Sequence, residues 1–252
     1  MDKEQYDLLY RLEERHWWYL GMREITSSLL SQHLKSARPA RILDAGCGTG
    51  GMVRYLGRFG AVYGIDIASE AMEGCRKRGV AETVAGGSIE RIPFASDTFD
   101  AVVSFDVLYH QAVVNDVTAL AELNRVLRPG GLLLVRVPAY DWLRCTHDVV
   151  VHTRHRYSEG ELERKLLAAG FQPRKLTYVN SLLFPIAAAK RLLEGTKRSV
   201  IADLEMPPAP INRLLLSALT LEASLVNRVS FPWGLSVVGV ASKQRPANHE
   251  QS

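Results

Sequence analysis

Cysteine is scarce in this sequence. The three cysteines, Cys47, Cys75 and Cys145, are odd in number and form no Cys-x-x-Cys pair, which excludes a disulfide framework and a cysteine zinc site. A run of about 18 apolar residues, long enough to span a bilayer, is also missing, so we expect no transmembrane helix. Residues 2–5, directly after Met1, are polar or charged, and we expect no signal peptide. These absences predict a reducing, cytoplasmic environment.

Long blocks of one charge are absent as well. The net charge is +4 over 252 residues, and no Lys/Arg block is long enough to predict a nucleic-acid partner. Residues 141–200 nevertheless hold 11 Lys/Arg against six Asp/Glu, which makes that segment +5 and the rest of the chain −1. Such an excess favours an anionic small molecule or a peripheral membrane contact, and it is equally consistent with solvated helix faces.

Apolar segments of strand length alternate with segments of helical periodicity. Strands are expected at 41–44, 61–66, 99–104, 132–137, 175–179 and 235–242. This alternation predicts an α/β fold with a doubly wound sheet. Residues 2–35 have the spacing of one long helix. We divide the chain into an N-terminal helical cap (1–38), a ligand-binding core (39–180), a helical insertion or lid (181–230), a final core strand (231–242) and a polar tail (243–252).

A glycine-rich turn follows the first expected strand. Gly46, Gly48 and Gly51 match the pattern Gly-x-Gly-x-x-Gly between a strand and a helix, where glycine lets the backbone turn tightly and touch a ligand. Asp66 ends the next strand, where a carboxylate accepts hydrogen bonds from both ribose hydroxyls. Asp44, two residues before the turn, would repel a pyrophosphate at this position. It suits an adenosine-containing ligand that carries an ammonium or sulfonium group.

Four segments resemble motifs of the class I S-adenosylmethionine (SAM)-dependent methyltransferases, in the right order. Residues 43–50, Leu-Asp-Ala-Gly-Cys-Gly-Thr-Gly, resemble motif I, and 64–67 resemble the end of the ribose-binding strand. Residues 92–102 and 126–131 resemble the "LPF…sFDvV" and "vLkPGG" stretches. The resemblance implies a Rossmann-like, seven-stranded sheet. It also implies an enzyme that moves a methyl group from SAM to a small-molecule acceptor and leaves S-adenosylhomocysteine (SAH).

The resemblance further implies which residues hold SAM. The matching positions are Tyr19, Arg23, Asp44, Gly46, Cys47, Gly48, Asp66, Ile67, Ser88, Ile89 and Phe105. Arg23, four residues after Tyr19 on one helix face, would bind the methionine carboxylate; the alternative is a helix that only packs on the sheet. Many members carry Asp where this chain has Ser88, so either the hydroxyl or the Ile89 amide would bind the adenine.

Three features resemble one branch of the family, found in bacterial exopolysaccharide, glycolipid and natural-product gene clusters. They are Ser88 followed by Ile89-Glu90, the segment His16-Trp17-Trp18-Tyr19 with Arg23, and the segment His147-Asp148…His152-x-Arg154-x-Arg156-Tyr157. The branch therefore implies an acceptor that belongs to this kind of chemistry.

Histidines are the candidates for a catalytic base, which a hydroxyl acceptor requires. His147, beside Asp148, and His152 lie where the family builds its acceptor pocket; a structural hydrogen bond to loop backbone is the alternative. His110 is interpreted as a packing residue near the cofactor. No metal is expected, because no helix with His-x-x-x-His and no cysteine pair accompanies these histidines.

Arg154 and Arg156 fall on one side of an expected extended segment. They would bind a phosphate or carboxylate, or form salt bridges with Asp148 or Glu159. The apolar helix 211–228 would pack in the core, form a dimer interface or cover the acceptor. These features favour an anionic amphipathic acceptor, such as a prenyl phosphate, a lipid-linked sugar or a natural-product intermediate. An NAD-dependent oxidoreductase and a non-catalytic SAM-binding protein are the alternatives.

Overall fold

The computed structural model describes residues 3–35, 38–194 and 206–245 and contains one seven-stranded sheet. The strands are β1 (Ala40–Ala45), β2 (Gly60–Asp66), β3 (Val84–Gly86), β4 (Phe99–Phe105), β5 (Leu127–Pro138), β6 (Phe171–Val179) and β7 (Ser236–Lys243). Their order is β3-β2-β1-β4-β5-β7-β6. The strands from β1 to β5 pair in parallel, whereas β7 is antiparallel to both β5 and β6. The Rossmann-like α/β fold is confirmed, and β3 is the strand that the sequence pattern missed.

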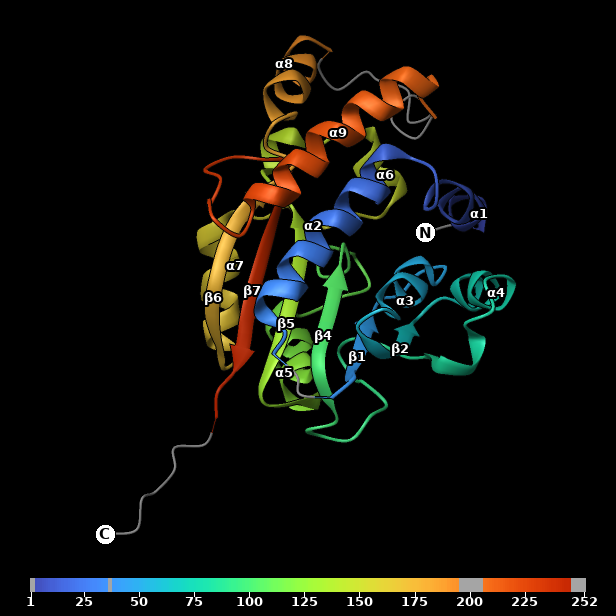
Figure 1. Cartoon of the computed structure of the whole chain (residues 1–252), viewed down its shortest axis with the longest axis vertical. Coiled ribbons are helices and arrows are strands. Elements are labelled where there is room, and N and C mark those ends of the chain that lie inside the picture. The colour runs from blue at the N-terminus through green and yellow to red at the C-terminus, as the bar shows by residue number, and fades with distance from the viewer. Residues whose placement is uncertain (1–2, 36–37, 195–205, 246–252) are drawn as a thin grey trace.

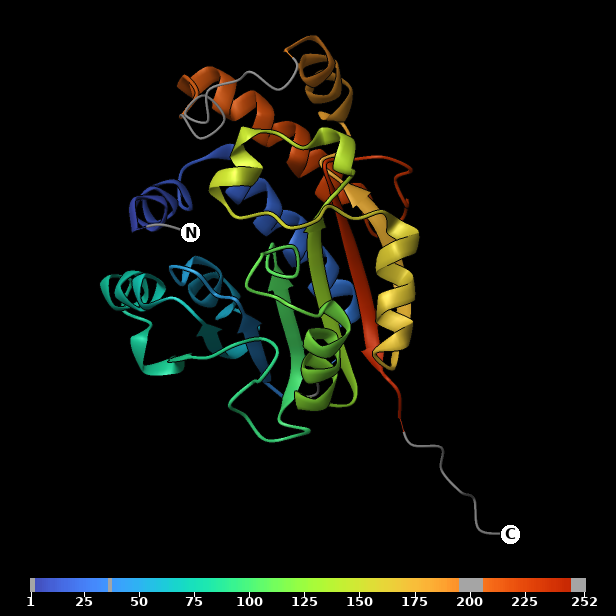
Figure 2. The same ribbon diagram turned by 180° about the vertical axis from the view of Figure 1, so that it is seen from behind.

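Helices cover both faces of the sheet. On one face lie α2 (Trp17–His33), α3 (Gly51–Leu56) and α9 (Ala209–Leu225), and on the other lie α5 (Asp116–Val126) and α7 (Glu159–Ala168) (Figures 1 and 2). The remaining helices are α1 (Lys3–Leu12), α4 (Ser69–Lys77), α6 (Thr146–Val150) and α8 (Phe184–Glu194), with short 3-10 turns at Ala81–Thr83 and Asp141–Leu143. Each face has its own apolar core, built around Leu30 and Ile42 on the first and around Phe99 and Leu120 on the second.

The N-terminal segment forms two helices, so the expectation of one helix over residues 2–35 is wrong. α1 ends at Leu12 and α2 begins at Trp17. His16 has extended backbone angles, and its Nδ1 accepts a hydrogen bond from the Trp18 amide at 3.3 Å. A side chain that caps a helix start in this way satisfies a free amide and fixes where the helix begins.

α9 packs along α2, so the predicted insertion and the predicted cap lie against one another (Figure 1). The approach is close at Gly21, where a Cβ atom would lie 2.4 Å from Leu219 Cδ1. Asn212 links the helices through hydrogen bonds with the Trp17 amide and the Arg15 carbonyl. Leu214, on the opposite side of α9, is 71% exposed. The domain boundaries, the dimer interface and the membrane contact stay predictions.

The strand order places a cavity at the carboxyl ends of the parallel strands. The chain proceeds from β1 outward to β2 and β3, then returns to β4 on the other side of β1. Helices leave the carboxyl ends of β1 and β4 toward opposite faces, and an open crevice forms at such a reversal. The candidate site lies in this crevice.

Candidate active site

The glycine turn after β1 forms one wall of a cavity of about 730 Å³. Gly46 and Gly48 have φ values of +93° and +52°, in the left-handed region that favours glycine. At Gly46 a Cβ atom would also lie 2.2 Å from Val107 Cγ2. The Gly46 and Cys47 amides donate to the Ile65 carbonyl at 2.8 and 2.9 Å, which ties the turn to β2. A side chain at Gly46 would therefore move the turn away from any ligand.

Asp66 is fixed at the end of β2 and lines the cavity. Its Oδ2 accepts from the Gly48 amide at 2.9 Å, and its Oδ1 accepts from the Ala68 amide at 3.0 Å. Burial raises the pKa of Asp66, and these backbone hydrogen bonds oppose that shift. The carboxylate is thus oriented before any ligand arrives, and each oxygen retains a further lone pair for a hydroxyl.

Asp44 is the most buried carboxylate of the cavity wall, at 2% exposure. Its Oδ2 has no hydrogen-bond partner among the described residues. Burial, with smaller contributions from the charges of Glu13 and Asp66, raises the pKa of Asp44 to about 8. A cation bound beside this oxygen would stabilise the ionised form and lower that pKa.

Most of the other predicted cofactor positions belong to the same cavity. Tyr19, Cys47, Ile67, Ser88, Ile89 and Phe105 all line it. Ile67 is 66% exposed, an unusual position for a large apolar side chain. The Ser88 hydroxyl accepts from the Glu90 amide at 3.2 Å, which leaves its proton available to a ligand.

Arg23 lies next to the glycine turn but is not among the described residues that line the cavity. Its Nη2 is 2.9 Å from the point that a Cβ atom of Gly51 would occupy, and its guanidinium stacks 5.5 Å from the centre of the Tyr55 ring. The predicted bond to a methionine carboxylate therefore stays a prediction.

Glu13 joins the N-terminal helices to the glycine turn, a link that the sequence analysis missed. The residue is buried, accepts from the Thr49 hydroxyl at 2.5 Å, and forms an ion pair with Arg78 at 2.7 Å. The link brings α1 over the cavity, where Tyr6 and Leu9 form part of the lining.

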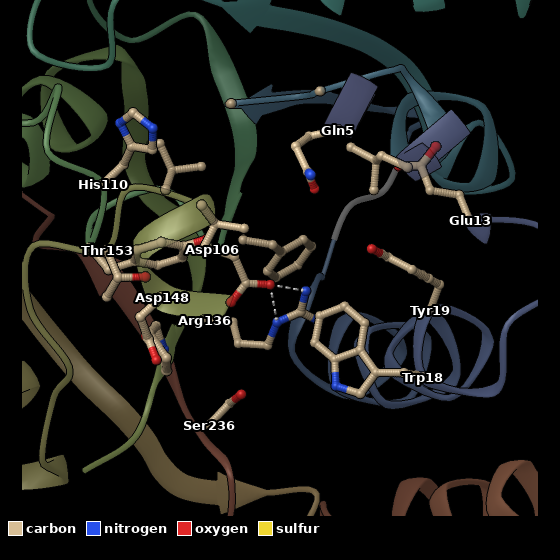
Figure 3. Close-up of a pocket in the computed structure, with 18 of the residues that line it drawn as sticks. Gln5, Glu13, Trp18, Tyr19, Asp106, His110, Arg136, Asp148, Thr153 and Ser236 are labelled. Carbon is tan, nitrogen blue, oxygen red and sulfur yellow. Dashed lines mark hydrogen bonds and ion pairs between the residues drawn. The ribbon is translucent and has the colours of Figure 1, made fainter. Parts of the chain in front are cut away.

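An ion pair that the sequence analysis also missed stands in the middle of the cavity (Figure 3). The Arg136 guanidinium donates to Asp106 Oδ2 from Nε at 3.0 Å and from Nη2 at 2.5 Å. It lies between the rings of Trp18 and Phe105, at 4.9 and 5.0 Å from their centres. The sequence contains a sign of this pair, because Arg136 is a charged residue within the apolar segment of β5 and needs a partner there.

The candidate bases differ in their placement. The backbone of His147 lies in α6, and its side chain is outside the described part of the structure. His152 is not among the described lining residues; its ring packs 5.7 Å from that of His110, which does line the cavity. His110 Nδ1 accepts from the Ala112 amide at 3.0 Å, so its neutral ring carries the proton on Nε2 and acts as a donor. The roles of His147 and His152 as bases stay predictions.

Arg154 and Arg156 do not form a shared anion site. Arg156 lines the cavity, but its Nε and Nη2 donate to the two oxygens of Asp148 at 2.8 and 3.1 Å. Arg154 pairs instead with Asp116, which also accepts from Tyr157 and Lys165. The salt-bridge interpretation is therefore right for Arg156 and Asp148, and Arg154 has a different partner from either of those expected.

The far side of the cavity is mainly apolar. Leu183, Ile186 and Ala187 of the α8 region and Leu215 of α9 line it, together with the exposed Lys190. Among the described residues, no cluster of three His, Cys, Asp or Glu side chains could hold a metal ion. No described helix is long and apolar enough to cross a membrane.

Comparisons with known proteins agree with this geometry. A family model described as a methyltransferase domain matches residues 43–135. The chain is 32% identical over 184 residues to the malonyl-[acyl-carrier protein] O-methyltransferase of Pseudescherichia vulneris, and the match covers 68% of this chain and 69% of that protein. It is 37% identical over 119 residues to the enzyme of the same name from Enterobacter lignolyticus, strain SCF1, where the match covers 47% of each chain. The chain thus spans only about half of the length of some curated relatives.

Solved structures share the fold. A Haloferax volcanii complex of a methyltransferase activator and a methyltransferase matches with a TM-score of 0.62 at 18% identity, over 98% of this chain and 99% of that one. A geranyl diphosphate methyltransferase in complex with SAM matches with a TM-score of 0.57 at 19% identity, over 87% and 85% of the two chains.

Proposed function

We propose that this chain, which belongs to the class I SAM-dependent methyltransferase family, transfers a methyl group from SAM to a small-molecule acceptor and releases SAH. The observation that carries the proposal is the buried, unpartnered Oδ2 of Asp44 beside the glycine turn. SAM brings an ammonium and a sulfonium group, either of which would compensate this carboxylate. The ionised Asp44 would repel the pyrophosphate of NAD, and the protonated form offers it no positive charge, so the oxidoreductase alternative fits the site less well.

The residues that would hold SAM fit its parts. Asp66 would bind the ribose hydroxyls, Ser88 and Ile89 the adenine, and Asp44 the cationic methionine end. When bound, SAM supplies a methyl carbon that its sulfonium already activates. The contribution of the chain is then to hold the acceptor atom about 3–3.5 Å from that carbon and in line with it. The partly enclosed cavity also limits access of water to the reacting groups.

The acceptor that we propose is an anionic amphipathic molecule, such as a prenyl phosphate, a lipid-linked sugar or a natural-product acid. Supporting features are the apolar wall of Leu183, Ile186 and Leu215 and the exposed Lys190 at the same side of the cavity. Because Arg154 and Arg156 are paired with carboxylates, Lys190 takes the cationic role that the sequence analysis gave to them. The matched proteins include enzymes named for malonyl-[acyl-carrier protein] and geranyl diphosphate.

Two measurements test the proposal. Isothermal titration with SAM, SAH and NAD should show binding of the first two only, and binding of NAD without SAM would contradict the assignment. Radiolabelled SAM should then transfer its methyl group to at least one of a fatty acid, a malonyl thioester or geranyl diphosphate. Asp66→Ala is the control that should weaken both SAM binding and methyl transfer. Tight SAM binding without transfer to any acceptor, including extracts of the source organism, would favour the non-catalytic alternative.

A further inference from the structure

Asn180 occupies an unusual position directly after β6. It has a positive φ of 58° and is only 1% exposed, although it lines the cavity. Neither its Nδ2 nor its Oδ1 has a hydrogen-bond partner in the part of the chain that the structure describes. A buried polar group without a hydrogen-bond partner destabilises the folded protein. An amide with both atoms unpaired at a cavity wall therefore points to a bound molecule that pairs with it.

The turn that carries Asn180 does not need this amide for its own stability. Glu222 of α9, which is 0% exposed, accepts from the backbone amides of Asn180 at 2.5 Å, Ser181 at 2.7 Å and Leu182 at 3.2 Å. Burial raises the pKa of Glu222, and the three backbone hydrogen bonds oppose that shift. Because Glu222 fixes the backbone, the side chain of Asn180 is free to serve a ligand.

A second polar group lies opposite the residue that precedes Asn180. Ser236 of β7 is the register partner of Val179, is 5% exposed and lines the same cavity. Figure 3 shows Ser236 on the side of Asp148 and Arg136. Both charges already have partners, since Asp148 pairs with Arg156 and Arg136 pairs with Asp106. Asn180 and Ser236 are thus neutral polar groups next to the apolar wall formed by α8 and α9.

The position in the sheet separates this pair from the predicted cofactor residues. β6 is the edge strand, and β4, β5 and β7 lie between it and β1. Strands are about 4.8 Å apart, so β1 and β6 are about 19 Å apart across the sheet. A molecule in contact with Asn180 would therefore occupy the acceptor side of the cavity and not the side of Asp44 and Asp66.

We propose that Asn180, assisted by Ser236, binds a neutral group of the acceptor that both donates and accepts a hydrogen bond, namely a hydroxyl or an amide. A carboxylate could accept from Nδ2 but would face Oδ1 without a proton to donate. An alkyl group would leave both amide atoms unpaired. The inference rests on the proposed function and adds to it: the acceptor carries a neutral polar group within its apolar body, apart from its anionic end.

The test uses the full chain saturated with SAH. The probes are hexanoate, octanoate, decanoate and dodecanoate, each with and without a terminal hydroxyl, and their affinities are measured by titration. One neutral hydrogen bond contributes about 0.5–1.5 kcal/mol, so the hydroxyl should improve affinity about two- to twelvefold at the matching chain length. This gain should vanish in Asn180→Gly, which removes the amide and accepts the positive φ.

Two further variants keep the test decisive. Ser236→Ala leaves the turn intact and should reduce the gain at least twofold, even if Asn180→Gly fails to fold. Asn124→Ala removes an amide whose Nδ2 is also without a partner but that does not line the cavity, and it should retain the full gain. Absence of SAH binding to the parent would contradict the proposed function. Normal SAH binding with no hydroxyl-dependent gain at any length, or with a gain that Asn180→Gly retains, would overturn the inference.

Discussion

Asp44 is expected to release a proton when SAM binds. Burial raises the pKa of its carboxyl to about 8, so about nine-tenths of the free protein is protonated at this position at pH 7. A bound ammonium or sulfonium group stabilises the carboxylate and returns its pKa toward the usual value of about 3.9. Binding at pH 7 should therefore release about 0.9 proton.

The same shift predicts how affinity depends on pH. Protonation at pH 7 opposes SAM binding by about 1.4 kcal/mol, which is about tenfold in Kd. The affinity for SAM should fall about tenfold for each pH unit below 8 and level off above it. Proton release is measured by titration calorimetry in buffers of different ionisation enthalpy, and Kd is measured from about pH 6 to pH 9.

Asp44→Asn is the matched control, because it keeps the shape of the side chain and cannot ionise. The ligand's own titration is the same for both proteins, so the difference between them belongs to Asp44. The variant should bind SAM at least tenfold more weakly at pH 9 and lose the extra proton. Equal proton release by the two proteins would refute the role given to Asp44.

A second readout is stability. Since the pKa of Asp44 in the folded protein is raised, the SAM-free parent should lose stability as pH rises from about 4 to 8, and Asp44→Asn should lose less.

Three other substitutions test the site. Asp66→Ala should weaken SAM binding at least tenfold, because hydrogen bonds to a charged acceptor are worth about 1.5–3 kcal/mol each; an unchanged Kd would exclude the ribose contact. Arg23→Ala should weaken SAM much more than decarboxylated SAM, and equal losses would return Arg23 to a structural role. Arg156→Gln should lower the free energy of unfolding by about 3 kcal/mol in denaturant titration, because Asp148, whose side chain is 3% exposed, loses its partner. Burial raises the pKa of Asp148, but the hydrogen bonds and charge of Arg156 outweigh burial, so the pKa lies below its usual value. The stabilisation should therefore be present above about pH 4 and disappear as pH falls. A variant as stable as the parent would show that the pair contributes nothing.

Local sequence was sufficient to predict that the proposed cofactor residues lie close together. Gly46, Gly48 and Asp44 lie within one strand and the turn after it, and Asp66 lies at the end of the adjacent parallel strand. Parallel strands that pair side by side bring their carboxyl ends to one edge, so a short-range pattern fixes which residues meet. The sequence missed the break before Trp17, because the helical spacing continues across a cap that depends on one side chain of His16.

Tertiary structure alone decided how the charged and polar groups on the proposed acceptor side are paired. Arg156 pairs with Asp148 across a loop, and Arg154 reaches Asp116, 38 residues earlier in the chain. Arg136 of β5 pairs with Asp106, which directly follows the adjacent strand β4. Glu222, 42 residues later in the chain, accepts a hydrogen bond from the backbone amide of Asn180, while the side-chain amide of Asn180 has no partner among the described residues. A charge or an amide in the sequence shows only what it can bind; burial and the groups brought against it by the fold determine which of those bonds are already made and which remain for a ligand.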